Sequence, residues 1–536
     1  MIYDGPELAR HAANHTALSP VSILKRVERV HPELPAQIHG RIRRNWGEVA
    51  QRCKRLASAL DKRGVGKGDT VSLIAPNIPE SLECALALPM IGAVLNANNT
   101  RLDAETIAYI LDHGEAKVLL VDTEFANLAS KAISKIDREI LVIDIEDTEG
   151  AGGTRIGSLT YDELLAEGDP NFAYALPSDE WDALSLNYTS GTTGRPKGVV
   201  YSHRGAWTNA VNNAVTWEIP HFPVYLWTLP LFHCNGWCFP WTITLLAGTH
   251  VFLRSPGADA IYDAFADHGV THLCGAPIVM SMISSAEQKR EFPQKIQMMT
   301  AAAPPPATVI EKMEAMGISI THVYGLTEVY GPAVVCAEKP SWDEYSTQAQ
   351  ADLKARQGVA YELQEDVLVL DQITGQPVPW DGQTLGEVAF RGNIVMKGYL
   401  KAPLETEEAF KDGWFWSGDI AVQHPDGYVE IRDRSKDIII SGGENISSIE
   451  VEKALHSHPA VGLVAVVAMP DEKWGEVPCA FAELESEASE QELLDYAKTK
   501  LAGFMCPKRV IFGDLPKTST GKILKNKLRD IARNLI

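Results

Sequence analysis

The sequence predicts a large N-terminal α/β domain, made of stacked and mostly parallel sheets covered by helices, and a smaller C-terminal α+β domain. Three observations predict this fold. Helix-like and strand-like segments alternate between about residues 46 and 325, β-rich runs punctuated by Gly, Pro and Asp begin near Val367, and roughly the last hundred residues mix helices with strands again. A chain of 536 residues is also too long for one compact core.

The alternation begins with WGEVAQRCKRLASALDKRG (residues 46–64), where apolar residues recur at helical spacing and a glycine follows. A buried strand is then expected at 70–76, a helix at 79–92 and another strand at 116–122. Helix–strand pairs recur at 261–276 and at 307–325. Strands joined through helices in this way form parallel sheets whose faces the helices cover.

From about residue 360 the pattern changes to a β-rich part. Short β-type runs occupy residues 366–371, 386–392 and 428–433, and HPDGY (424–428) carries the Asp-Gly signal of a tight hairpin. These runs predict a small antiparallel sheet or a β-barrel-like part that closes the N-terminal domain.

The remaining segments predict an independent C-terminal domain. Helix, strand, helix and strand patterns follow one another at 447–461, 462–470, 489–503 and 508–514. The predicted organisation is therefore an N-terminal domain of residues 1–433, a connection at 434–436, and a C-terminal domain of residues 437–536.

Composition excludes several classes of protein. The formal net charge of -21 would repel a phosphate backbone, so no nucleic-acid partner is expected. The N-terminus has no secretory pattern, and the longest apolar stretch, CALALPMIGAVLNA, is too short to cross a bilayer. Eight scattered cysteines are typical of buried thiols in a reducing compartment. HCNGWC (233–238) contains metal-ligand types, but no second ligand cluster accompanies it. We expect a cytoplasmic protein.

One loop carries the first chemical signal. YTSGTTGRPKGVVYSH (188–203) lies between strand-like segments and lacks both the Walker and the dinucleotide-binding spacings. Its hydroxyl and backbone N–H groups suit phosphate oxygens, and Lys197 adds a positive charge. The phosphate-binding candidates are Thr189, Ser190, Gly191, Thr192, Thr193, Gly194 and Lys197. The alternative is an ordinary surface loop.

The full string YTSGTTGRPKGV resembles the signature of the adenylate-forming superfamily, which includes acyl-CoA synthetases, luciferases and nonribosomal adenylation domains. In that family the loop holds the β- and γ-phosphates of ATP. VYGLTEVYGP (323–332) resembles a second family motif, which implies that Tyr324 stacks on adenine, Thr327 contacts the α-phosphate and Glu328 binds Mg²⁺. A hard carboxylate oxygen suits Mg²⁺, and ATP supplies further ligands.

Three further motifs, one before and two after residues 323–332, complete the family's set. AAAPPP (301–306) is similar to the adenine-binding segment and implies contacts at Ala302 and Ala303. GWFWSGDIA (413–421) implies that Asp419 binds the ribose hydroxyls, with Arg434 as a second ribose or phosphate contact, since one carboxylate can accept two hydrogen bonds. LPKTSTGKILK (515–525) places Lys522 at the adenylation lysine of the family. The resemblance extends from Trp46 to the C-terminus.

The resemblance implies two half-reactions and the co-substrates ATP, Mg²⁺ and CoA. A carboxylate attacks the α-phosphate of ATP to give an acyl-adenylate and pyrophosphate, and a thiol then displaces AMP. Family members rotate a mobile C-terminal domain between the two steps, about a hinge that corresponds here to Lys436. The loop SGGENIS (441–447) would then border the pantetheine arm of CoA through Gly442, Gly443 and Glu444.

The identity of the acid is the open question. PLFHCNGW (230–237) corresponds to the segment that lines the acyl pocket, so His233 and Trp237 are candidates, although both could be core aromatics. A bulky Trp237 favours a short or medium chain. The motifs are most similar to the short- and medium-chain branch, and within it to the 3-methylmercaptopropionyl-CoA ligases, which activate 3-(methylthio)propionate. Medium-chain fatty acids and aromatic acids are the alternatives.

Other functions remain as rivals. An amino-acid adenylation domain or a luciferase would share every motif; the chain ends soon after Lys522, without a carrier domain, which favours free CoA as acceptor. A non-catalytic nucleotide-binding protein is the alternative from a different class. A P-loop ATPase is disfavoured because a strand, and no helix, is expected after the loop. If the protein is oligomeric, a homodimer is the expected form.

Overall fold

The computed structural model describes residues 2–189, 195–287, 289–301, 307–434, 436–441, 444–471, 473–517 and 523–535. The chain forms two compact units. The first contains residues 1–190, 196–366 and 391–408, and the second contains residues 191–195, 367–390 and 409–536. The short return of residues 391–408 to the first unit carries strand β19 (Gly398–Tyr399) to the edge of a sheet.

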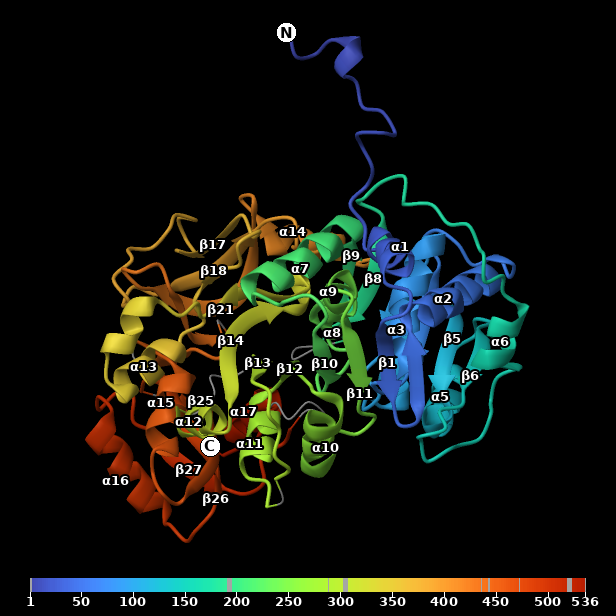
Figure 1. Ribbon diagram of the computed structural model, residues 1–536. Helices are drawn as coiled ribbons and strands as arrows, with labels where there is room; N and C mark the ends of the chain where they lie inside the picture. Colours follow the sequence, from blue (N-terminus) through green and yellow to red (C-terminus); the bar gives the residue numbers. More distant parts are fainter. Residues whose placement is uncertain are drawn as a thin grey trace. The chain divides into compact units, whose positions relative to one another are not determined.

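The first unit contains two large and mostly parallel sheets, within the described part of the chain (Figure 1). One has eight strands in the order β19-β9-β8-β4-β3-β5-β6-β7, of which only β8–β9 and β9–β19 pair antiparallel among the described pairings. Its strands are β3 (Thr70–Ile74), β4 (Val94–Ala97), β5 (Ala116–Asp122), β6 (Leu141–Ile145), β7 (Leu159–Thr160), β8 (Ala183–Tyr188), β9 (Gly198–Ser202) and β19 (Gly398–Tyr399).

The second sheet of this unit has nine strands among the described residues, in the order β16-β15-β14-β13-β12-β10-β11-β1-β2. Its centre from β14 to β1 is parallel, and antiparallel strands close both edges. The strands are β1 (Pro35–His39), β2 (Ile42–Asn45), β10 (Val224–Trp227), β11 (Thr249–Phe252), β12 (His272–Gly275), β13 (Ile296–Thr300), β14 (Ile318–Leu326), β15 (Gly331–Val335) and β16 (Val359–Ala360).

Helices cover these sheets and bury their apolar faces. The helices of the first unit are α1 (Val21–Val30), α2 (Trp46–Asp61), α3 (Pro79–Ala87), α4 (Ala104–His113), α5 (Ala126–Ile133), α6 (Tyr161–Glu167), α7 (His203–Thr216), α8 (Cys234–Trp237), α9 (Phe239–Leu245), α10 (Ala258–His268), α11 (Pro277–Ser284), α12 (Ala307–Ala315), α13 (Thr347–Lys354) and α14 (Pro403–Ala409). Asn45 and Glu48 form a capping box at the start of α2. The Asn45 side chain accepts the backbone N–H of Glu48, and the Glu48 side chain accepts the backbone N–H of Asn45.

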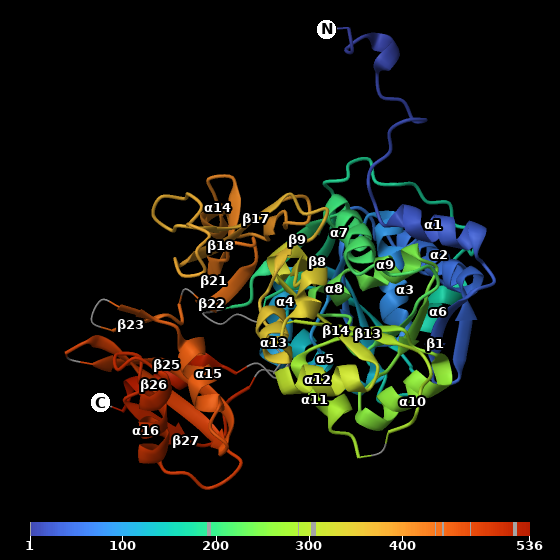
Figure 2. The same cartoon turned by 60° about the vertical axis from the view of Figure 1, so that its left-hand side comes forward.

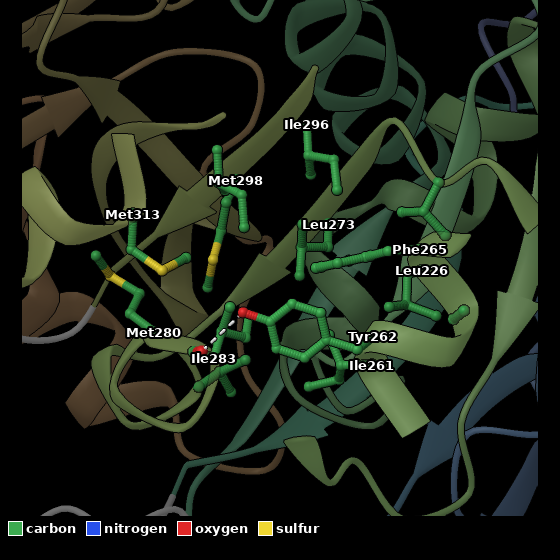
Figure 3. Close-up of a cluster of buried hydrophobic side chains, with 14 of the residues drawn as sticks. Leu226, Ile261, Tyr262, Phe265, Leu273, Met280, Ile283, Ile296, Met298 and Met313 are labelled. Carbon is green, nitrogen blue, oxygen red and sulfur yellow. Dashed lines mark hydrogen bonds between the residues drawn. The ribbon is translucent and has the colours of Figure 1, made fainter. Parts of the chain in front are cut away.

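Figure 3 shows how one such face is filled. Tyr262 and Phe265 of α10 lie on one side of the cluster, and Met280 of α11, Met298 of β13 and Met313 of α12 lie on the other. The Tyr262 hydroxyl donates to the Ile283 carbonyl at 3.1 Å, so its polar end is satisfied inside the apolar cluster. The unbranched methionine side chains fill the irregular space that remains.

The second unit contains two smaller sheets, each of five strands among the described residues. The first is β17-β18-β21-β20 with β22 added to β21, and the second is β24-β23-β26-β25 with β27 added to β26 (Figure 2). The strands are β17 (Asp366–Leu370), β18 (Gly386–Arg391), β20 (Phe410–Lys411), β21 (Trp414–Gln423), β22 (Val429–Arg434), β23 (Ile439–Ser441), β24 (Glu444–Ile446), β25 (Val461–Asp471), β26 (Gly475–Leu484) and β27 (Arg509–Phe512).

The sheet containing β25 and β26 is covered on both faces. Val466, Ala480 and Ala482 pack with α15 (Ser448–His456) and α16 (Glu490–Lys500), whereas Ala465 and Phe481 pack with α17 (Lys525–Arg533). Successive residues of a strand point to opposite faces, which explains why neighbours in the sequence contribute to different clusters.

The predicted fold class and most of the predicted elements are confirmed. The helix predicted from residue 46 is α2, and the strands predicted at 70–76 and 116–122 are β3 and β5. One prediction needs correction: SGGENIS was expected to be a loop, but Ser441 and Glu444 lie opposite each other in the antiparallel strands β23 and β24. All eight cysteines are buried, as expected.

A charged cluster is buried between α2 and α3. Glu83 has no exposed side-chain surface and accepts hydrogen bonds from Arg52 at 2.8 Å, Arg44 at 3.1 Å and the Tyr161 hydroxyl at 2.8 Å. Glu80 lies farther from the same guanidinium groups, 3.5 Å from Arg52 and 3.9 Å from Arg44. Burial, followed by the nearby negative charge of Glu83, raises the pKa of Glu80 to about 7.

Replacing Glu80 with glutamine is expected to stabilise the protein above neutral pH. Since the folded protein raises the pKa of Glu80 from 4.5 to about 7, its contribution to stability is complete below about pH 4.5 and is lost as pH rises through about 7. The lost contribution is of order 3 kcal/mol. The thermal midpoint of Glu80→Gln relative to wild type should therefore rise between pH 5 and 8. Glu105→Gln, at an exposed glutamate, is the control, and a pH-independent difference for Glu80→Gln would contradict the assignment.

Candidate functional site

The base of the candidate phosphate loop is fixed by the hairpin of β8 and β9. The backbone N–H of Thr189 donates to the Lys197 carbonyl at 3.0 Å, and the Lys197 N–H is 3.3 Å from the Thr189 hydroxyl oxygen. A strand follows the loop, which confirms the expected difference from a P-loop. The predicted phosphate contacts at Ser190, Gly191, Thr192, Thr193 and Gly194 lie outside the described residues.

The second motif forms the end of β14 and the short 3₁₀ helix Thr327–Val329. Tyr324 is buried near the end of the strand. The Thr327 carbonyl accepts a hydrogen bond from the Tyr201 hydroxyl at 2.6 Å, and the Thr327 hydroxyl lies 3.5 Å from the Cys234 sulfur. Burial raises the pKa of the Cys234 thiol to about 12, so this group stays neutral at physiological pH.

Glu328 and Lys197 come together through a third residue, Tyr399. The Tyr399 hydroxyl donates to Glu328 Oε1 at 2.9 Å, and Lys197 Nζ lies 4.6 Å from the centre of the Tyr399 ring. Burial and the adjacent carboxylate raise the pKa of Tyr399, so the hydroxyl remains a donor. Tyr399 was not among the predicted site residues. It stands in the segment KGYL (397–400), far from both motifs in the sequence.

The donor set at Glu328 fits Mg²⁺ held together with a nucleotide. Glu328 supplies one hard carboxylate, and no group of three or more His, Cys, Asp or Glu side chains within the described ranges could hold a metal alone. Mg²⁺ commonly uses one or two carboxylates and completes its shell with substrate phosphates and water. The residues therefore fit a nucleotide-associated ion better than a dedicated metal site.

The segment proposed to line the acyl pocket has an unusual backbone. All residues from Cys234 to Cys238 have positive φ angles between 40° and 65°, so this turn is left-handed. His233, which precedes the turn, is exposed, whereas Trp237 is only 6% exposed. The Trp237 carbonyl accepts a hydrogen bond from Asn213 at 2.8 Å.

Gly331 packs directly against this turn. A Cβ atom at Gly331 would lie 3.0 Å from the Trp237 Cα, and Gly331 has a φ of 106°. Both the space and the backbone angle therefore favour glycine at this position. Gly331 belongs to the same motif as Thr327 and Glu328 (residues 323–332), so this motif packs against the Trp237 turn.

Other predicted residues of this unit are only partly described. β13 ends at Thr300, directly before the candidate adenine-binding segment, but Ala302 and Ala303 lie outside the described residues. In the second unit, Lys522, Gly442 and Gly443 also lie outside them, and Glu444 is exposed at the start of β24. The roles assigned to these residues stay predictions.

The predicted ribose-binding pair lies in the second unit. Asp419 of β21 is opposite Arg434 of β22, and the two side chains are 3.4 Å apart. Asp419 is only 5% exposed, and its backbone N–H donates to the Ser417 hydroxyl oxygen at 3.1 Å. The pairing of β21 with β22 thus places a carboxylate and a guanidinium side by side.

The residues flanking Lys436 are held by the helices of the second unit. Asp433 Oδ2 accepts the first N–H of α15, from Ser448, at 2.5 Å, and Asp437 forms an ion pair with Arg529 of α17. Lys525 of α17 binds Glu452 of α15 at 2.7 Å. Contacts on both sides of Lys436 therefore define one arrangement of this segment.

Comparison with known families assigns two matches to the chain. The family model described as AMP-binding enzyme matches residues 24–400, and the model of the AMP-binding enzyme C-terminal domain matches residues 450–522. Among the described residues, no helix combines the length and apolar character needed to cross a membrane.

Curated relatives align over nearly the whole length. The peroxisomal acetate/butyrate–CoA ligase of Arabidopsis thaliana is 47% identical over 554 residues, which cover 99% of this chain and 97% of the relative. The peroxisomal trans-cinnamate:CoA ligase of Petunia hybrida is 45% identical and covers 98% of this chain and 95% of its own length. Neither is a 3-methylmercaptopropionyl-CoA ligase, and both are peroxisomal, so the cytoplasmic location stays a prediction.

A solved structure agrees with this fold. The o-succinylbenzoate CoA synthetase of Bacillus subtilis, in complex with its acyl-adenylate intermediate, superimposes with a TM-score of 0.81 at 27% identity and covers 95% of this chain and 98% of its own. The same enzyme has been solved with ATP and magnesium ion, at 26% identity and a TM-score of 0.81.

Proposed function

Because the chain belongs to the AMP-binding enzymes, the adenylate-forming acyl-CoA ligase superfamily, we propose that it activates a short- or medium-chain carboxylic acid and transfers the acyl group to CoA. The products are an acyl-CoA thioester, AMP and pyrophosphate. One observation carries the proposal: Lys197 of the phosphate loop and Glu328 of the second motif, 131 positions apart in the sequence, contact the same tyrosine.

In the first half-reaction, the substrate carboxylate attacks the α-phosphorus of ATP and pyrophosphate leaves. Charge moves onto the phosphate oxygens, so the protein must supply fixed donors and cations rather than a nucleophile. Thr189 and Lys197 would hold the β- and γ-phosphates, and Thr327 and Lys522 the α-phosphate. Glu328 would hold Mg²⁺, which neutralises phosphate charge. Tyr324, Ala302 and Ala303 would position adenine, and Asp419 and Arg434 the ribose.

In the second half-reaction, the CoA thiolate attacks the acyl carbon of the adenylate and AMP leaves. Lys436 would act as the hinge of the C-terminal domain, and Gly442, Gly443 and Glu444 would border the pantetheine arm. The pairing of Ser441 with Glu444 in β23 and β24 supports this assignment, because it holds the residues on either side of the two glycines together. Glycine has no side chain, so a narrow chain can pass close to its backbone.

Two observations support a small acid. Trp237 is buried in a turn whose backbone is fixed by Asn213 and Gly331, so its indole would limit the depth of a pocket there. The Arabidopsis relative is named for acetate and butyrate. 3-(Methylthio)propionate falls in this size range and remains our specific candidate. The Petunia relative is named for trans-cinnamate, which supports an aromatic acid as the alternative.

A panel of propionate, butyrate, hexanoate, octanoate, benzoate and 3-(methylthio)propionate tests the proposal. AMP release should require both an acid and CoA, with the highest kcat/KM for an acid of hexanoate size or smaller. A highest value for benzoate would support the aromatic alternative. Nucleotide binding without acid-dependent AMP release would indicate the non-catalytic alternative.

Replacing Trp237 with alanine is expected to shift the preference toward longer acids. The kcat/KM ratio of octanoate to butyrate should rise by about tenfold or more, since each accommodated methylene contributes to discrimination in an apolar pocket. Trp217→Ala, which removes another buried tryptophan, is the matched control and should lower stability without changing the ratio. An unchanged ratio in folded Trp237→Ala would remove Trp237 from the acyl pocket.

A further inference from the structure

Strand pairing places Tyr399 beside the phosphate loop. β19 pairs antiparallel with β9, so that Tyr399 lies opposite Val199 and Gly398 opposite Val200. The N–H of Leu400 donates to the Gly198 carbonyl at 2.7 Å, one residue after Lys197. The side chain of Tyr399 is therefore positioned by the backbone of the strand that leaves the loop.

The turn after β19 fixes Tyr399 from the other side. Its N–H donates to the Thr406 hydroxyl oxygen at 3.0 Å, and Thr406 donates in turn to the Ala402 carbonyl at 2.8 Å. Gly398 has a φ of 145°, and a Cβ there would lie 2.8 Å from Thr406 Cγ2. A glycine is required at this position because the backbone angle is unfavourable for other residues and the space is filled.

From this position, one side chain contacts two residues of the proposed adenylation machinery in different ways. The hydroxyl donates to Glu328 Oε1 at 2.9 Å, a charge-assisted bond that uses one of about four acceptor sites on the carboxylate. The ring faces the Lys197 ammonium at 4.6 Å, within the range of a cation–π contact. The hydroxyl can thus orient the carboxylate while the ring restrains the lysine.

We propose that Tyr399 is a positioning residue for adenylation, which orients the Glu328 carboxylate toward the nucleotide-bound metal and steadies Lys197 against the departing pyrophosphate. The inference rests on the proposed function, because it takes Glu328 and Lys197 as ligands of MgATP. Tyr399 acts through these two residues and does not itself need to touch the substrate.

Calorimetric binding of ATP without acid tests the inference, because no turnover occurs. Tyr399→Phe keeps the ring and removes the hydroxyl, so MgATP should bind about tenfold more weakly, the size of a lost hydrogen bond to a charged group, while ATP in EDTA should change less than about twofold. Tyr399→Leu also removes the ring. It should weaken the binding of MgATP and of ATP in EDTA, since the restraint on Lys197 is lost as well.

A double-mutant cycle distinguishes positioning from general structure. In a Glu328→Gln background, Tyr399→Phe should change MgATP affinity by less than about twofold, because the carboxylate it orients is gone. Tyr262→Phe is the matched control: it removes a buried tyrosine hydroxyl bond in the core of the same unit and should leave both affinities unchanged. Circular dichroism and thermal midpoints confirm that each variant is folded.

The outcomes separate the inference from the function on which it rests. Unchanged MgATP affinity in Tyr399→Phe, equal losses with and without the metal, or an undiminished effect in the Glu328→Gln background would each overturn the positioning role. If the wild-type protein catalyses acid-dependent ATP–pyrophosphate exchange, those results leave the proposed function intact. A wild-type protein that neither binds MgATP nor catalyses exchange would overturn both.

Discussion

Replacing Lys522 with alanine is expected to abolish acid-dependent ATP–pyrophosphate exchange and to spare thioester formation from a synthetic acyl-adenylate. The lysine would stabilise charge that develops on the α-phosphate, and removing one such group commonly reduces the rate on the order of 10²–10³. The second half-reaction starts after the adenylyl group has been transferred to the acid and pyrophosphate has left, so it does not need that charge. Exchange of labelled pyrophosphate and thioester formation from the adenylate measure the two steps separately.

Lys527→Ala is the matched control for this experiment. Lys527 is an exposed lysine of α17, five positions after Lys522, and its loss should leave both half-reactions unchanged. Exchange activity that persists in Lys522→Ala would show that Lys522 is not required for adenylation. Equal loss of both steps would indicate a general defect in the C-terminal domain.

Replacing Lys436 with proline is expected to block thioester formation more than adenylation. Proline fixes φ near -65° and removes the backbone N–H, so the backbone rotation required of a hinge would be restricted. The rate of thioester formation should fall on the order of tenfold or more relative to exchange, as for a blocked conformational step. Single-turnover measurements of the two steps give the ratio.

Lys436→Ala separates the backbone from the side chain, because it removes the ammonium and keeps the backbone free. In Lys436→Ala, the ratio of the rate of thioester formation to the rate of exchange should stay close to that of the wild-type protein. Proportional losses of both steps in Lys436→Pro would argue against a hinge, and a similar effect of alanine would transfer the role to the side chain. The ion pair of Asp437 with Arg529 gives a reason to expect one preferred arrangement in the absence of ligand.

Local patterns accounted for most elements of the fold. Apolar periodicity predicted α2, and the apolar run of β5 occupies its predicted residues. These signals succeed because they depend on neighbours in the sequence. The hairpin of β23 and β24 was missed, since each strand has three residues and their pairing is too short to produce an alternating pattern.

The sequence predicted which motifs belong to the candidate site, but it did not predict which residues contact one another there. Lys197 and Glu328 are recognisable from their surrounding sequences, but the pairing of β19 with β9 brings Tyr399 between them from a segment some 70 residues later than Glu328. A two-residue strand has no periodicity, and no local rule predicts its partner. The pairing of β19 with β9, and with it the position of Tyr399, could therefore be learned only from the structure.

The two compact units also divide the chain differently from the motifs. The β-rich segments 367–390 and 409–434 group with the C-terminal residues, whereas the motif-based boundary falls at 434–436. The compact units are defined by which residues pack together. The boundary at 434–436 is the place where the backbone would rotate. A compact unit can contain a hinge when its helices hold one arrangement, as α15 and α17 hold the residues around Lys436.

The left-handed turn from Cys234 to Cys238 restricts which residues its five positions can accept. β-Branched residues strongly disfavour positive φ, so Val, Ile and Thr are poor replacements at any of its five positions, whatever the acid. Asn213 holds the turn through the Trp237 carbonyl, a contact that does not depend on the side chain at position 237. Under the proposed function, changes in acyl preference at this turn would therefore come from the size of the side chain at position 237, among unbranched and aromatic residues.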